Sequence, residues 1–108
     1  MSKTWNFSKK DEINADSTKA LQELKGEVIK VTGIALTDGV DNQTGEVREV
    51  ALLKTEEHGI VSTISKTVLR MIPKVIDYVE EEDLNEVEIR VESGISKDGN
   101  EFVMIKLV

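Results

Sequence analysis

A single segment, Ile60–Val79, constrains the fold of this 108-residue chain more than any other stretch. Its first part, Ile60–Ser65, alternates apolar and small polar residues, as a half-buried strand does. From Lys66 onward the apolar residues recur at helical spacing, namely Val68, Leu69, Ile72, Val75, Ile76 and Val79. The regions on either side are typical of strands and turns. We therefore expect one central helix between two sets of strands.

Pro73 lies inside the expected helix and leaves two alternatives open. A proline in a helix interior removes one hydrogen bond and clashes with the preceding turn, at a cost of about 3 kcal/mol. Either one helix continues through Pro73 with a kink, or a helical turn over residues 66–71 precedes a second helix. The apolar pattern stays in phase across the proline, which favours one kinked helix.

Two strands are expected before this segment. They are Glu27–Thr37 and Val47–Thr55, and residues 38–46 between them are rich in turn formers and form a hairpin loop. Gly33 interrupts the first strand, which indicates a bulge or a sharp bend there. Such a bend lets one strand serve two sides of a small barrel.

Two more strands are expected after the helix. Glu86–Glu92 alternates charged and apolar residues, the pattern of a strand with one buried face. Ser96–Asn100 contains an Asp-Gly pair that is typical of a hairpin turn. Glu101–Val108 then forms the last strand. The resulting order is three strands, a helix and two strands.

The N-terminal region is expected to contain an arm and a short helix. Residues 1–15 are polar, and we expect a mobile or loosely docked arm. Thr18–Lys25 would form a short helix, with Asp16 or Ser17 as its N-cap. Gly26 suits the position after its end.

This element order predicts a mainly β fold, a five-stranded OB-like Greek-key barrel with one helix between its third and fourth strands. An open α+β sheet with the helix across one face has the same order and stays an alternative. We expect an arm over residues 1–15 and a single OB-like domain over residues 16–108.

Catalysis, a metal site and a bound cofactor are not expected. The chain has no cysteine, and its single histidine, His58, lies in a turn without a second histidine for a metal site or a proton relay. No phosphate-binding loop or dinucleotide-binding glycine motif is present. The N-terminus lacks an apolar leader and no apolar run approaches membrane-spanning length, so no membrane partner is expected.

The net charge of −7 comes from one part of the chain. Residues 77–92 contain eight acidic residues and one arginine, whereas acidic and basic residues balance in the remainder. A polyanionic partner would be repelled from this acidic window. The rest of the surface can still present a neutral or basic face.

Candidate base-stacking rings are few. A sequence-tolerant binder of single strands needs flat rings for the bases and cations for the phosphates. Trp5 and Phe7 lie among three lysines, and they either stack bases or fold back against the barrel. Phe102 lies on the strand face opposite Val103, and it either offers a stacking surface or belongs to a second core layer.

Candidate phosphate contacts lie on the strands. In an OB-fold the ligand groove crosses strands two and three, between the loops that join strands one–two and four–five. Four cations flank this path, namely Lys30, Arg48, Lys54 and Lys97. A further basic stripe on the helix would lie off the groove, and it comprises Lys66, Arg70 and Lys74.

The region Gly26–Val108 resembles a family of small OB-fold proteins from bacteriophages of Gram-positive bacteria. Four sequence segments carry this resemblance, and the first of them begins two residues before Gly26. They are LKGEVIKVTGIALTDG, TGEVREVALLKTEEHG, STISKTVLR and GISKDGNEFVMIKLV. The family is described as phage single-stranded-DNA-binding proteins. The resemblance implies a replication or recombination accessory that coats single strands in the host cytoplasm.

The sequence thus predicts a non-enzymatic protein that binds single-stranded DNA with little sequence preference. A host or phage replication protein as a further partner and a homodimer are additional possibilities. The alternative is a protein-interaction module, a phage regulator that docks a host or replisome protein through strand edges or the acidic window.

Overall fold

The computed structural model describes residues 3–15, 18–40 and 44–108. Within these ranges the chain forms two α-helices, one 3-10 helix and a seven-stranded sheet. In chain order the elements are β1 (Lys3–Trp5), α1 (Lys9–Asn14), β2 (Lys19–Ala20), η1 (Leu21–Leu24), β3 (Val28–Val40), β4 (Val47–Thr55), β5 (Gly59–Thr63), α2 (Lys66–Glu81), β6 (Val87–Ile95) and β7 (Glu101–Leu107).

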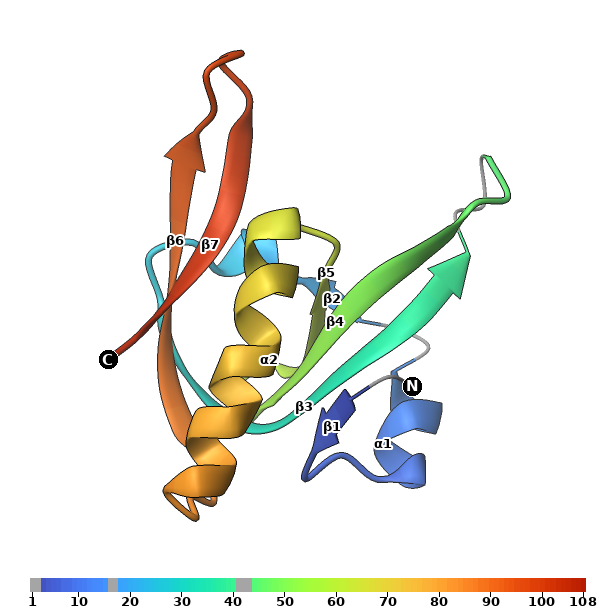
Figure 1. Ribbon diagram of the computed structural model, residues 1–108, viewed down its shortest axis with the longest axis vertical. Helices are drawn as coiled ribbons and strands as arrows, with labels where there is room; N and C mark the ends of the chain where they lie inside the picture. The colour runs from blue at the N-terminus through green and yellow to red at the C-terminus, as the bar shows by residue number, and fades with distance from the viewer. Residues whose placement is uncertain (1–2, 16–17, 41–43) are drawn as a thin grey trace.

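One long strand, β3, connects the two halves of the sheet. The strand order is β2-β5-β4-β3-β6-β7, and β1 pairs with β3 outside this path. The first residues of β3 pair with β6, and the rest pairs with β4. The register shifts between Val31 and Gly33, which confirms the predicted irregularity at Gly33. The sheet therefore curls into a half-barrel around α2, compatible with an OB-like fold (Figure 1).

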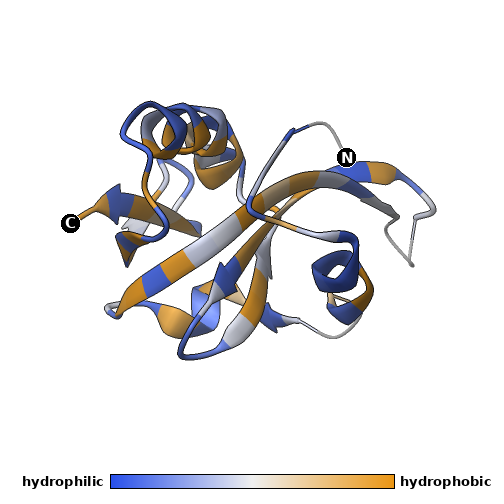
Figure 2. Cartoon of the chain, turned by 90° about the horizontal axis from the view of Figure 1, so that it is seen from below, coloured by the Kyte–Doolittle hydropathy of each residue, from blue (hydrophilic) through white to orange (hydrophobic). Residues whose placement is uncertain are grey.

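Helix α2 fills the concave side of this sheet. Its buried residues are Val68, Ile72, Val75, Ile76 and Val79, which is the expected stripe apart from Leu69, a partly buried residue. They pack in one core with residues of the strands such as Ile34, Leu53 and Ile89. Figure 2 shows hydrophobic residues alternating with hydrophilic ones along the strands, and a helix with one hydrophobic side.

Pro73 lies inside an uninterrupted helix, so the alternative of two separate helices was wrong. The missing hydrogen bond costs about 3 kcal/mol. Each of the five buried side chains of α2 contributes roughly 1.5–3 kcal/mol through the removal of apolar surface from water. Burial of the stripe therefore outweighs the cost of the proline.

The expected helix over Thr18–Lys25 was wrong. Lys19–Ala20 instead pairs parallel with β5, and Leu21–Leu24 forms a 3-10 helix. A 3-10 helix has three residues per turn, so Leu21 and Leu24 both reach the core from one side. The proposed caps Asp16 and Ser17 lie outside the described residues. An α-helix forms earlier, at α1, where Ser8 and Asp11 make a capping box.

Both long hairpins extend further than the sequence indicated. β3 continues to Val40, into the loop expected over residues 38–46, and β6 continues to Ile95. The β3–β4 and β6–β7 hairpins therefore project beyond the core as two arms (Figure 1). The start of α2 lies between them, where Ser65 is its N-cap as predicted.

The N-terminal segment joins the sheet through β1. Lys3–Trp5 pairs antiparallel with β3, and Trp5 is buried in the core with 9% of its surface exposed. The next residue, Asn6, has a left-handed backbone with φ 49° and donates from Nδ2 to the Thr32 carbonyl at 2.6 Å. Thr32 is the extra residue at the register shift, so the N-terminal segment is bound to β3 at this bulge. The boundary between an arm and a domain at residue 15 stays a prediction.

We predict that Gly33→Ala destabilises the protein by about 1–3 kcal/mol, the range for overpacking a close contact. A Cβ atom at Gly33 would lie 2.5 Å from the Asn6 carbonyl oxygen, which belongs to the backbone. Urea unfolding measures the loss, and emission of the single tryptophan, Trp5, reports whether the segment has moved. Gly39→Ala is the control, since its Cβ would meet only a side-chain methyl at 3.1 Å. Equal stability of Gly33→Ala and wild type would contradict the docking of this segment on Gly33.

Candidate nucleic-acid interface

A cleft lies between the two hairpin arms, with the junction of β5 and α2 as its floor. Three adjoining hollows form it, two between β4 and the start of α2 and one beside β7. We call this surface the arm cleft, and define it by Gln22, Glu46, Arg48, Glu49, Thr63, Ile64, Ser65, Lys66, Leu69, Arg70, Glu101 and Phe102.

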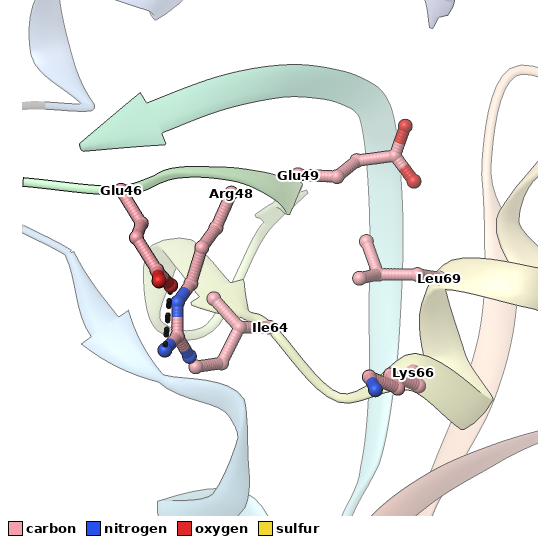
Figure 3. A pocket seen from close by; sticks show the side chains of 6 residues that line it. All are labelled: Glu46, Arg48, Glu49, Ile64, Lys66 and Leu69. Atoms are coloured by element: carbon pink, nitrogen blue, oxygen red, sulfur yellow. Dashed lines mark ion pairs between the residues drawn. The ribbon is translucent and has the colours of Figure 1, made fainter. Parts of the chain in front are cut away.

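The β4 side of the arm cleft combines cations with apolar side chains. Arg48 and Glu46 point to one side of β4, where their side chains pair at 3.7 Å, and Glu49 points to the other side (Figure 3). Ile64 lies below them with 53% of its surface exposed. Lys66 has no carboxylate partner within the described residues. Cationic and apolar groups therefore share one accessible surface.

Hydrogen bonds fix the floor of the arm cleft. Ser65 Oγ accepts the Val68 N–H at 3.5 Å and donates to the Val103 carbonyl at 2.8 Å. The Ser65 N–H donates to Thr63 Oγ1 at 3.0 Å. Ser65 thereby starts α2 and ties it to β7, across the gap between β5 and β7. Lys66, the first residue of α2, is held at the bottom of the cleft as a consequence.

Phe102 supplies an aromatic ring on the β7 side. It pairs across the hairpin with Gly94, and a Cβ atom at Gly94 would lie 2.7 Å from Cζ of the ring. Only glycine leaves room for the ring to lie on the neighbouring strand. The ring is half-buried and lines the arm cleft with Thr63 and Ile64. Glu101 beside it is paired with Lys25, which lowers the pKa of the Glu101 carboxyl.

The charges on α2 run against the helix dipole. A helix N-terminus favours anions and a C-terminus favours cations, by about 0.3–1 kcal/mol for each group. In α2, however, Lys66 and Arg70 occupy the start, whereas Glu80 and Glu81 occupy the end. Sixteen residues of helix place these ends about 24 Å apart. The acidic end of α2 therefore lies far from the start of α2 and the arm cleft, whereas Glu88 and Glu92 of the acidic window lie on β6 (Figure 1).

The structure brings only part of the predicted interface together. Arg48 and Phe102 line the arm cleft, and Lys97 is exposed in the turn of the β6–β7 hairpin. Lys30 lies in the other half of β3, opposite Glu88, where its N–H donates to Glu57. The four cations therefore do not line one groove.

Lys54 and Phe7 lie on a different surface. Lys54 Nζ is 2.9 Å from the Asp11 carboxylate of α1, and both side chains are partly buried. Phe7 is half-buried and lines a shallow hollow with Lys54. The Trp5 ring is in the core, so in this conformation it offers no face to a base.

The sequence reasoning placed the helix stripe off the ligand groove, but Lys66 and Arg70 of this stripe lie at the arm cleft. Both line a hollow with Glu49 and Leu69, and Lys66 also lines the adjoining hollow that contains Arg48. The sequence did indicate that Lys66 lies at the junction of strand and helix, because Ser65 before it was recognised as the N-cap. The direction in which the two hairpins project was not visible in the sequence.

Comparisons with known proteins agree on one family. The model of the family described as phage single-stranded DNA-binding protein matches residues 11–108. The chain belongs to this family. A single-stranded DNA-binding protein of Bacillus phage B103 is 31% identical over 97 residues, covering 88% of this chain and 80% of that protein. One of Bacillus phage PZA is 31% identical over 84 residues, covering 76% and 68%. No solved structure matches the chain.

Two further observations concern the described part of this family member. It contains no group of three histidine, cysteine, aspartate or glutamate side chains placed to hold a metal ion. Its helices are all too short or too polar to span a bilayer.

We predict that the Asp11 pKa rises part of the way toward 3.8 in Lys54→Gln. The Ser8 N–H contributes most to lowering this pKa and Lys54 contributes next, so the variant keeps the larger cause. Because the folded-state pKa is lowered, the charged carboxylate stabilises the fold above about pH 4, and this contribution is lost as the pH falls through the lowered value. NMR titration of the Asp11 carboxyl carbon measures the shift, with Lys74→Gln as control. An identical Asp11 pKa in wild type and Lys54→Gln would contradict the ion pair.

Proposed function

We propose that this protein binds single-stranded DNA without catalysing a reaction, and that the strand passes through the arm cleft. One observation carries this proposal: cations and an aromatic ring line the same cleft. The chain's relatives in phages B103 and PZA are named for single-stranded DNA binding. No comparison supports the alternative of a protein-interaction module.

We further propose that β3–β7 are the five strands of an OB-like barrel. Their pairing supports this correspondence, since β3, β4 and β5 form a meander and β3 also pairs with β6, the partner of β7. The α2 helix lies between the third and fourth of these strands. The arm cleft then lies between the two loops that border the ligand groove in OB-folds.

Phosphates and bases meet different parts of the arm cleft. Lys66, Arg48 and Arg70 supply positive charge for phosphates, and Lys97 extends this charge along the β6–β7 hairpin. Bases stack on Phe102 and contact the exposed Ile64. Neither contact depends on which base is present, because every base has a flat face and every nucleotide a phosphate. The mode of binding is therefore tolerant of sequence.

This function suits an accessory of phage DNA replication or recombination that acts in the host cytoplasm. The protein would cover single strands as they form. The acidic end of α2 repels the strand, and this repulsion confines binding to the opposite end of the molecule.

Fluorescence anisotropy of a labelled strand of about 30 nucleotides, across a series of salt concentrations, tests the function. Each neutralised phosphate of a single strand contributes about −0.7 to the slope of log affinity against log salt. Contacts with about three phosphates therefore predict a slope near −2. Absence of binding at low salt, or binding without salt dependence, would overturn the proposed function.

We predict that Phe102→Ala weakens binding by about 1–3 kcal/mol, the value of one base stacked on an aromatic ring. The same anisotropy measurement gives the loss. Met104→Ala is the matched control, because Met104 lies on the same face of β7 and is also half-buried, but does not line the arm cleft. Equal effects of the two substitutions would show that the ring acts only through packing.

We predict that Lys66→Gln weakens DNA binding while it stabilises the fold. The substitution removes a phosphate contact, and it also removes a cation from a helix N-terminus, where the dipole disfavours it by roughly 0.3–1 kcal/mol. Thermal unfolding and anisotropy measure the two effects. Lys74→Gln, in the middle of the same helix, is the control. It should change DNA affinity and thermal stability less than Lys66→Gln does. If Lys66→Gln binds as tightly as wild type, Lys66 does not contact the strand.

A further inference from the structure

The ion pair between Asp11 and Lys54 holds a carboxylate of α1 against a cation of β4. Lys54 lies on the same face of β4 as Arg48, because their separation along the strand is even and the register is regular between them. We propose that Lys54 is a second phosphate-contact site, which α1 closes with Asp11 and which a bound strand opens by displacing α1. This inference rests on the proposed function and extends the interface from the arm cleft along β4.

The closing carboxylate is held in place by its own helix. The Ser8 N–H donates to Asp11 Oδ2 at 2.9 Å, and the Asp11 N–H donates to Ser8 Oγ at 3.2 Å. Asp11 Oδ2 also accepts from Lys54 Nζ at 2.9 Å. Asp11 therefore faces Lys54 as a fixed anion, and its side chain keeps only 18% of its surface exposed. A phosphate oxygen offers the same charge and the same acceptor to the lysine.

Displacement of α1 requires little disruption of the core. None of the six residues of α1 is buried, and Ile13 on this helix keeps 65% of its surface exposed. The segments on either side hold their own anchors, since Trp5 is in the core and Thr18 Oγ1 bonds to Ser62 Oγ at 2.8 Å. Only α1, Lys9–Asn14, has to leave the sheet, while β1 stays paired with β3 and Asn6 stays bonded to the Thr32 carbonyl.

The uncovered surface carries groups that suit a nucleotide. Phe7, Asn6 and Thr4 line the hollow with Lys54, so a ring and hydrogen-bonding side chains surround the cation. Lys54 lies six residue steps along β4 from Arg48, which is about 20 Å. A strand must therefore be long enough to leave the arm cleft before it reaches Lys54.

The test compares Asp11→Asn with Glu12→Gln. Both substitutions remove one negative charge from α1, but Glu12 is exposed and pairs with no cation in the described parts of the chain. Asparagine at position 11 can still accept the Ser8 N–H, so the cap of α1 is kept. Anisotropy with strands of about five and about 30 nucleotides is measured over a salt series. Circular dichroism and Trp5 emission check that each variant is folded.

We expect Asp11→Asn to bind the long strand roughly fivefold more tightly, the lower end of coupling between protein sites. Its salt slope should become steeper by about 0.7, as one more phosphate is contacted. The short strand should show no such gain, and Lys54→Gln should abolish the gain when combined with Asp11→Asn.

Equal gains in Asp11→Asn and Glu12→Gln, or no gain in Asp11→Asn while wild type binds, would overturn the inference and leave the proposed function standing. Absence of binding by the wild-type protein would overturn the proposed function and this inference together. Retention of the gain in the double variant would show that Lys54 is not the contact.

Discussion

The bend of β3 at Gly33 is the constraint on which the rest of this structure depends. One extra residue, Thr32, changes the register there, and the strand can pair with β6 before it and with β4 after it. The two hairpins that bound the arm cleft are the continuations of these pairings. The same glycine leaves room for the Asn6 carbonyl, so the N-terminal segment is positioned from the same point. The half-barrel, the arm cleft and the position of the N-terminal segment thus all depend on the bend at Gly33.

Helix α2 sets the electrostatics of the molecule. Its buried stripe supports the concave sheet despite Pro73, and its exposed charges oppose the dipole at both ends. Such an arrangement lowers helix stability, and it places the cations of α2 at the arm cleft and the carboxylates of α2 about 24 Å away from it. A protein with net charge −7 can in this way present a local surface that attracts a polyanion. Function therefore accounts for a charge pattern that helix stability alone disfavours.

Periodicity predicted the central elements well and the N-terminal region poorly. The β4 bounds, the start of α2 directly after its N-cap Ser65 and the irregularity at Gly33 followed from apolar spacing, capping and glycine, which are local signals. The 3-10 helix at Leu21–Leu24 was missed because two leucines three residues apart fit either helix type. The gathering of Lys66, Arg48 and Phe102 depends on how the hairpins project, and the pairing of Lys54 with Asp11 depends on tertiary docking. Neither is encoded within a short window of sequence.

The path of the strand through the arm cleft is the central claim, and amide NMR spectra of isotope-labelled protein titrated with oligothymidylate test it most directly. The account predicts that the largest shifts arise at Ile64, Lys66 and Phe102, with smaller ones at Lys54 as the strand is lengthened. Shifts concentrated at the acidic end of α2, around Glu80–Asp83, with the amides of the arm cleft unmoved, would contradict it.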